Sequence, residues 1–349
     1  STLELPVNVL VPIIDDNVDI VIDLGLLSQP LNPNVIFGES ASIGKLVDNS
    51  TGEKFNVVGN KIDTFAFKAG EYSFTAYNEE NTFGSVVNVC VADFVVYNPQ
   101  DLTRIGETEH LSQYIAIANN IDFGNEVYIN PNKNGSFNGT LNGLGHTIKN
   151  IVFAAPCENY NGVKYSQDKY GSSGLFAYTS DCTFKNLSMI NVKLYGWNSS
   201  PLFYRGNGIV IIDNVYMQSE LLSPEMRNGG GLFSFCFSGQ VKVSNSIIVL
   251  TGANINENVR NSCGGICARL NAPLVVTNTH LISDGDICSV KEDYYNRGSG
   301  AANSLNINYE DEASFILEMN KEESRVNLQG FNKYWKIDGV NCPKFLSNS

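Results

Sequence analysis

Four stretches of this chain repeat one pattern, and that repetition limits the folds open to it. Each stretch opens with a small or turn-forming residue and two apolar ones, crosses a short turn, and continues into a strand ending in Asn-x-x-apolar. The stretches are GLFAYTSDCTFKNLSMINVKL from Gly174, PLFYRGNGIVIIDNVYMQSEL from Pro201, GLFSFCFSGQVKVSNSIIVL from Gly231 and GICARLNAPLVVTNTHLIS from Gly265, with starts 27, 30 and 34 residues apart. Such units bury their apolar faces only by stacking on their neighbours. They predict a right-handed, single-stranded parallel β-helix over residues 98–349.

An asparagine recurs at one position of the repeat, and an earlier turn supplies another. These residues are Asn150, Asn186, Asn214, Asn245 and Asn278. In turns stacked about 4.8 Å apart, side-chain amides can bond to one another along the stack. We therefore predict an internal asparagine ladder with a structural role. Three positions later, a parallel apolar stack is expected from Met189, Met217, Ile248 and Leu281.

Two segments ahead of the first repeat read DLTRIGETEHLSQYIAIANNIDF and FNGTLNGLGHTIKNIVF. They resemble the opening of GLUG-type β-helix proteins, which occur on bacterial surfaces and in phage virions. The resemblance rests on Tyr114, Ile121, Asp122, Phe123, Phe137, Asn138, Gly139, Thr140, Gly143, Gly145, His146, Thr147, Ile148 and Asn150. It implies a short capping helix from Asp101 to Glu107, N-capped by Asp101 or Gln100, over the open end of the first turn.

The end of the chain, YWKIDGVNCPKFL, resembles the closing element of the same proteins. This implies that Trp335, Ile337 and Phe345 close the last turn. The repeats depart from the family pattern at Pro201, which replaces an opening glycine, and at Cys267, which stands where its neighbours have an aromatic residue.

Residues 1–97 read as about seven short strands with alternating apolar residues, which indicates an antiparallel β-sandwich. The segment AGEYSFTAYNEENTFGSVVNVCV predicts a final hairpin. One face of its first strand carries Tyr72, Phe74 and Ala76, and one face of its second carries Val87, Val89 and Val91. This cadence resembles bacterial immunoglobulin-like domains. The expected organisation is an Ig-like sandwich over 1–97 and the β-helix over 98–349.

Charge and composition restrict the partners of the chain. The net charge of −13 argues against a nucleic-acid-binding surface, because phosphate contacts need clustered Lys and Arg. No apolar run is long enough for a membrane span, so we expect no membrane insertion. The eight cysteines lack the spacing of a zinc site and are expected to be small buried residues; no metal or cofactor is predicted.

Catalytic residues are sparse in this sequence. A glycoside hydrolase needs two carboxylates close together, and Asp181 and Asp213 occupy unequal positions in their repeats. Asp284 and Asp286 form the best acidic cluster, which loop solvation also explains. His110, His146 and His280 occur without a catalytic motif. Catalysis is therefore not expected, although a polysaccharide lyase or glycoside hydrolase stays open as an alternative.

Aromatic residues gather in the segments between turns. They are Tyr160, Tyr165, Tyr170, Tyr195, Trp197, Tyr294 and Tyr295. Tyr and Trp offer large amphipathic contact surfaces at small entropic cost and can stack on sugar rings. We expect an extracellular protein of a bacterial surface or a phage virion that attaches to a glycan or host surface through these loops. A structural spacer that contacts only neighbouring subunits is the remaining alternative.

Overall fold

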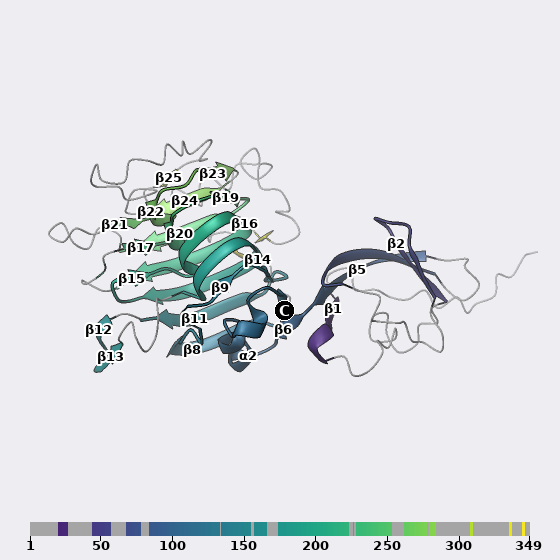
Figure 1. Cartoon of the computed structure of the whole chain (residues 1–349), viewed down its shortest axis with the longest axis horizontal. Helices are drawn as coiled ribbons and strands as arrows, with labels where there is room; N and C mark the ends of the chain where they lie inside the picture. Colours follow the sequence, from purple (N-terminus) through teal and green to yellow (C-terminus); the bar gives the residue numbers. More distant parts are fainter. Residues whose placement is uncertain are drawn as a thin grey trace, which may run out of the picture. The chain divides into compact units, whose positions relative to one another are not determined.

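Two compact units make up the chain in a computed structural model, residues 1–95 and residues 96–349. Both are built mainly from β-strands, as expected for an all-β protein (Figure 1). No helix among the described residues has the length and apolar character that crossing a bilayer requires. The structure describes residues 20–26, 44–56, 68–77, 84–132, 134–154, 157–165, 174–222, 226, 228–252, 262–277, 279–283, 308–309, 335–336 and 344–345.

The first unit contains one mixed sheet with the strand order β1-β5-β4-β2-β3. β1 runs parallel to β5, and the other neighbours are antiparallel. A short 3-10 turn, Leu24–Leu26, follows β1. The strands are β1 (Ile20–Asp23), β2 (Lys45–Asp48), β3 (Lys54–Asn56), β4 (Gly70–Tyr77) and β5 (Gly84–Ala92).

The predicted hairpin of this unit is confirmed as β4 and β5. Its register sets Tyr72 opposite Val89 and Phe74 opposite Val87. Phe74 and Val89 are almost fully buried. Burial of such side chains stabilises the sheet by about 1.5–3 kcal/mol each. The second sheet of a sandwich is not seen among the described residues of this unit.

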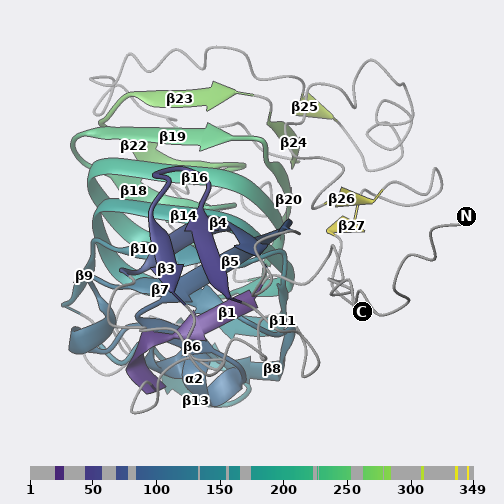
Figure 2. The same cartoon turned by 90° about the vertical axis from the view of Figure 1, so that its right-hand side faces the viewer.

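The second unit is a parallel β-solenoid, with about four turns between residues 121 and 283. Figures 1 and 2 show its strands stacked turn upon turn, from β8 and β11 to β23 and β24. Its sheet contains β6 (Phe94–Val96), β7 (Tyr114–Ile117), β8 (Ile121–Val127), β9 (Ser136–Phe137), β10 (Thr140–Asn142), β11 (Thr147–Phe153), β14 (Phe176–Leu194), β16 (Phe203–Leu221), β18 (Phe233–Cys236), β19 (Gln240–Ser244), β20 (Ile247–Thr251), β22 (Cys267–Leu270), β23 (Leu274–Thr277), β24 (His280–Ser283) and β25 (Asn308–Tyr309).

Three smaller sheets complete the described part of this unit. One is parallel and holds β15 (Asn198–Ser199), β17 (Asn228–Gly230) and β21 (Ser262–Gly264). The antiparallel pairs are β12 (Cys157–Tyr160) with β13 (Val163–Tyr165), and β26 (Trp335–Lys336) with β27 (Lys344–Phe345). Trp335 lies opposite Phe345. Ile337, the third residue of the expected closing element, lies outside the described residues.

The four repeats stack in register, which confirms the repeat alignment. Phe176, Phe203, Phe233 and Cys267 occupy one column, so Cys267 does stand where its neighbours have an aromatic ring. The rings of Phe203 and Phe233 stack with centroids 4.9 Å apart. The expected apolar stack is also confirmed, because successive pairings join Met189, Met217, Ile248 and Leu281, all completely buried.

Asparagine residues lie at the corners of the solenoid, where the backbone changes direction. β14 and β16 are 19 residues long and bend where the backbone enters the left-handed region. The positive φ angles include 51° at Asn186, 55° at Asn214 and 50° at Asn245. Asparagine tolerates this conformation better than most residues because its short side chain bonds locally. The repeated Asn therefore marks the residue where each turn changes direction.

A buried chain of side-chain amides runs along this corner, and we call it the asparagine ladder. Asn214 Nδ2 donates to Asn186 Oδ1 at 2.9 Å, and Asn186 Nδ2 donates to Asn142 Oδ1 at 3.1 Å. Asn142 Nδ2 in turn donates to the hydroxyl of Tyr114 at 2.8 Å. Asn142, Asn186 and Asn214 are 0%, 8% and 4% exposed. Every bond points from a later turn to an earlier one.

Two of the expected members are arranged differently. Asn150 lies at the next corner, in a second ladder, where its Nδ2 donates to Asp122 Oδ1 at 2.8 Å and its Oδ1 accepts from Asn191 Nδ2 at 2.6 Å. Asn245 keeps the left-handed corner, but its amide donates to Asp213 Oδ1 at 2.8 Å. The single column expected over these residues is therefore wrong. Asn278 lies outside the described residues.

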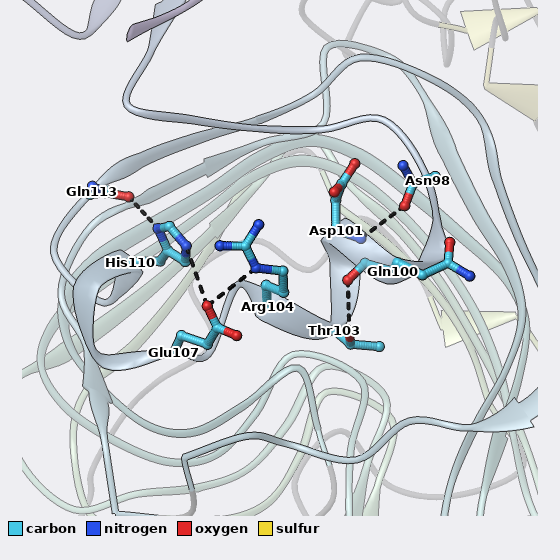
Figure 3. A network of polar contacts seen from close by, with 8 residues as sticks. All are labelled: Asn98, Gln100, Asp101, Thr103, Arg104, Glu107, His110 and Gln113. Carbon is cyan, nitrogen blue, oxygen red and sulfur yellow. Dashed lines mark hydrogen bonds and ion pairs between the residues drawn. The ribbon is translucent and has the colours of Figure 1, made fainter. Parts of the chain in front are cut away.

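The start of the second unit carries the expected helix, two residues earlier than predicted. α2 spans Pro99–Arg104, and Asn98 caps it by accepting from Asp101 N at 2.9 Å (Figure 3). Asn-Pro fixes this start because Pro suits the first helical position and Asn is a favoured cap. The cap predicted at Asp101 or Gln100 is therefore wrong. Leu102 of α2 is completely buried.

Candidate functional site

Tyr195 and Trp197 lie at a corner between β14 and β15, and both side chains are partly buried. The backbone around them is fixed. Tyr195 N donates to Phe153 O at 2.7 Å, and Trp197 O accepts from Asn228 N at 2.8 Å. Gly196 between them has a φ of 96°, which favours glycine. Two aromatic side chains are thus presented side by side in sequence on a well-bonded turn.

Of the other predicted binding residues, the structure describes Tyr160 and Tyr165. Tyr160 and Tyr165 belong to the two strands of the β12–β13 hairpin, where Tyr160 pairs with Val163 and Tyr165 with Cys157. Tyr170, Tyr294 and Tyr295 lie outside the described residues. The described geometry therefore brings only Tyr195 and Trp197 of the predicted set to one corner.

A different aromatic group lies on the repeats themselves, and we call it the aromatic–arginine cluster. It consists of Tyr204, Arg205, Phe235, Phe237 and Arg269. The guanidinium carbon of Arg205 lies 4.7 Å from the ring centroid of Tyr204 and 5.3 Å from that of Phe237. The rings of Phe235 and Phe237 stack at 5.7 Å with an interplanar angle of 7°. Arg269 adds a second cation, 5.7 Å from the ring centroid of Phe235.

The cluster combines buried support with an exposed aromatic face. Tyr204 and Phe235 are 4% and 8% exposed, whereas Phe237 is 41% exposed. Arg205 is partly buried, and its Nη2 donates to the hydroxyl of Tyr204 at 3.0 Å. Cation–π contacts of this kind contribute about 0.5–2 kcal/mol each, the larger values applying to desolvated pairs. The arrangement can hold a planar or ring-shaped ligand beside a positive charge.

Arg205 has no carboxylate within ion-pair distance among the residues that the structure describes. Its Nε is buried there without a hydrogen-bond partner. A buried N–H without an acceptor costs about 1–3 kcal/mol, and more when it carries charge. Arg205 is therefore a cation, in a protein of net charge −13, whose hydrogen-bonding capacity the described residues use only in part, through Tyr204.

Sequence analysis did not single out this cluster, although the repeats contained a signal for it. Tyr178, Arg205, Phe235 and Arg269 occupy the fifth position of the four repeats and pair directly in successive turns. Reading the repeats column by column would have shown aromatic residues and arginines sharing one position. Binding residues usually lie on loops, and the predicted aromatic residues were therefore those between the turns.

The side chains of Asp181 and Asp213, two candidate catalytic carboxylates, have structural partners. Asp181 accepts from Ile209 N at 2.8 Å, across to the next turn. Asp213 accepts from Asn245 Nδ2 at 2.8 Å and from the Ser244 hydroxyl at 2.6 Å. All three bonds join neighbouring turns, so these side chains contribute to stacking. Asp284 and Asp286 lie outside the described residues.

Glu107, Glu109 and His110 bring three possible metal-ligand atoms within 4.8 Å of one another in the turn after α2. Figure 3 shows the contacts around this turn, the 3-10 segment Thr108–His110. Glu107 Oε2 lies 3.3 Å from Arg104 Nε and 3.7 Å from His110 Nε2. The guanidinium of Arg104 already neutralises Glu107 and would repel a cation beside it. The contacts of Glu107 with Arg104 and His110 therefore stabilise the packing of α2 against the turn that follows it.

Burial shifts the pKa of three further titratable groups, the half-buried His146 and the buried Cys182 and Cys236. Burial lowers the pKa of His146 below its usual value, which favours the neutral ring. Cys182 and Cys236 are buried, and desolvation raises the pKa of the Cys182 thiol to about 12 and that of Cys236 to about 11. Cys90, Cys263 and Cys267 are buried as well, which confirms the expected role of these cysteines as small core residues.

Comparison with known proteins adds no assignment to this geometry. No protein-family model matches the chain, and no curated protein is significantly similar to it.

Proposed function

We propose that this protein is a non-catalytic attachment protein, whose solenoid presents aromatic side chains to a glycan or host surface. The observation that carries the proposal is Phe237, which is 41% exposed, stacked on Phe235 and backed by Arg205. Exposed aromatic rings held by a rigid scaffold are typical of binding sites, because they gain contact area without losing much side-chain entropy. Tyr195 and Trp197 supply a second aromatic surface of the same kind.

The finer fold assignment belongs to the same proposal. The solenoid is of the right-handed GLUG type, as the segments from Asp101 to Asn150 suggest by resemblance. The first unit is an Ig-like domain. The order β5-β4-β2-β3 is consistent with one sheet of an immunoglobulin variable-type domain. In that sheet the last strand, G, is followed by strands F, C and C′. A tandem of this type suits display outside the cell, on a bacterial surface or a phage virion.

The partners follow from this setting. A glycan or another host-surface molecule is the ligand, and neighbouring structural subunits are further contacts of a displayed protein. A net charge of −13 disfavours nucleic acid as a partner, because counterion release needs several phosphate contacts from Lys and Arg.

Glycan-array binding, combined with a reducing-sugar assay on the bound polysaccharides, tests the proposal. We expect binding without release of reducing ends, and weaker binding after Phe237→Ala with an unchanged melting temperature. An exposed aromatic side chain contributes little to the core, so its truncation should separate binding from folding. Cleavage of a bound polysaccharide would contradict the non-catalytic assignment, and absence of binding to both glycans and host cells would defeat attachment itself.

A further inference from the structure

We propose that the aromatic–arginine cluster binds a glycan carrying carboxylate groups, such as a chain of uronic acids. This inference rests on the proposed attachment function and names its ligand class. Four observations support it: the fixed orientation of Arg205, its unused hydrogen-bond donors, the spacing of Arg205 and Arg269, and the exposed ring of Phe237.

The guanidinium of Arg205 is already oriented before any ligand arrives. Tyr204, which is 4% exposed, accepts from Arg205 Nη2 at 3.0 Å. The rings of Tyr204 and Phe237 lie 4.7 Å and 5.3 Å from the guanidinium carbon. A side chain held in this way loses little conformational entropy when it binds an anion. Arg205 is therefore pre-organised for recognition.

The donors of Arg205 fit a carboxylate. A guanidinium has five N–H groups in a fixed fork and accepts no hydrogen bond. Among the described residues, Arg205 gives one of them to Tyr204 and leaves Nε–H buried without an acceptor. The other N–H groups of Nη1 and Nη2 can meet the two oxygens of one carboxylate in the bidentate geometry that arginine favours.

The position of Arg269 points to a polymer with repeated charges. Arg205 pairs with Phe235 in the next turn, and Phe235 pairs with Arg269 in the turn after that. Two turns of a solenoid separate their backbones by about 10 Å. An acidic oligosaccharide lying along the stack would meet one cation at Arg205 and a second at Arg269, both beside the ring of the buried Phe235.

Phe237 provides the surface for a sugar ring. Phe237 is 41% exposed, and its ring stacks on that of Phe235 with an interplanar angle of 7°. An aromatic face packs against the apolar C–H face of a pyranose. A neutral glycan would use this ring but not the arginines, and a nucleic acid would need more phosphate contacts than two arginines give. A sugar with a carboxylate uses both parts of the cluster.

Calorimetric titration of the full chain with oligomers of galacturonate, glucuronate and mannuronate and with sialyl oligosaccharides, each beside its methyl ester, tests the inference. The ester keeps the sugar ring and removes the charge. We expect at least one acid to bind about tenfold or more tightly than its ester, with affinity falling as salt is raised.

Arginine variants then locate that preference. Arg205→Gln should weaken binding of the acid about tenfold or more, and Arg205→Lys should recover only part of it, because lysine keeps the charge but lacks the fork. Lys242→Gln is the matched control, since it removes the same charge from an exposed position of β19 and should leave affinity unchanged. Melting temperatures of all three variants confirm that each is folded.

The other outcomes overturn the inference in distinguishable ways. Equal binding of acids and esters, or binding of sulfated but not carboxylated glycans, would overturn the carboxylate assignment and leave the attachment function standing. Loss of affinity in Lys242→Gln equal to that in Arg205→Gln would overturn the site, because overall charge would then explain it. No binding to any glycan or host cell would defeat the inference and the attachment function together.

Discussion

The side-chain amide of Asn214 donates to Oδ1 of Asn186 at 2.9 Å, and both residues hold the left-handed backbone conformation, at φ angles of 55° and 51°. One residue type thus satisfies two requirements of the corner. The backbone needs a residue that tolerates positive φ, and the buried interior needs each polar group to meet a partner. Alanine would fail both requirements, and glycine would meet only the first.

Asn214→Ala should lower the free energy of unfolding by about 2–5 kcal/mol, through an unsatisfied buried partner and a strained backbone. Asn214→Gly keeps the backbone conformation and should cost less. Asn191→Gly is the matched control, because Asn191 has a φ of 53° and makes the same amide bond at an exposed corner. Urea unfolding of the three variants measures the difference. Equal losses in Asn214→Gly and Asn191→Gly would contradict a contribution from burial.

The helix cap gives a smaller and separate prediction. Asn98→Ala leaves Asp101 N without its side-chain acceptor and should destabilise the second unit by about 1 kcal/mol. Asn98→Asp retains an acceptor at the same position and should stay within a few tenths of a kcal/mol of the natural chain. Thermal unfolding followed by circular dichroism compares them. If both substitutions cost the same, the hydrogen bond to Asp101 N is not what Asn98 contributes.

Stability should fall at alkaline pH because of the buried thiols. Burial raises the pKa of Cys182 from 9.0 to about 12 and that of Cys236 from 9.0 to about 11. The native state thus favours the protonated thiols, so their contribution is complete below pH 9 and is lost as pH rises through the folded pKa values. Urea unfolding at pH 8 and pH 10.5 should show the decrease, and Cys182→Ala should reduce it.

Because Cys182 and Cys236 are buried, we also expect their thiols to be alkylated slowly. At pH 8, both should resist alkylation in the native protein and react after unfolding, since the thiolate is the nucleophile. Peptide mass spectrometry of the alkylated chain identifies the modified cysteines. Rapid native labelling of Cys182 would contradict its buried, protonated state.

The corner at Tyr195 and Trp197 allows the two aromatic surfaces to be compared. The double substitution Tyr195→Ala and Trp197→Ala should preserve the fold, because alanine retains the backbone hydrogen bonds made by Tyr195 N and Trp197 O. Its binding to host cells or glycans should be compared with that of Phe237→Ala in the same assay. A loss confined to the Tyr195–Trp197 variant would place recognition at the corner and remove Phe237 from the site.

The solenoid was predictable because its signal recurs. Each repeat carries the same apolar residues at the same offset, so the columns at Phe203 and at Met217 could be read from the letters alone. The corner residues Asn186 and Asn214 were visible for the same reason. Asn142 was not, since it precedes its corner and reaches the ladder through a different local turn, in which Leu144 has a φ of 51°.

The sequence did not predict which individual side chains contact one another across the turns. Asn150 and Asn186 are both followed by apolar residues, yet they occupy different corners, because the register of β11 on β14 aligns Asn150 with Asn191. The aromatic–arginine cluster was missed for another reason. Arg205 and Arg269 look like ordinary surface charges until pairing with Phe235 sets them in one column.

The direction of the asparagine ladder has a consequence for how this protein can change in length. Each turn offers a donor to the turn before it and an acceptor to the turn after it, from Tyr114 through Asn142 and Asn186 to Asn214. After an in-frame duplication of one whole turn, such as residues 186–213, the new asparagine would have an acceptor in the turn before it and a donor in the turn after it. A duplication of half a turn would supply neither. The solenoid can therefore grow or shrink in genetic steps of one turn, and its length is set by the number of repeats.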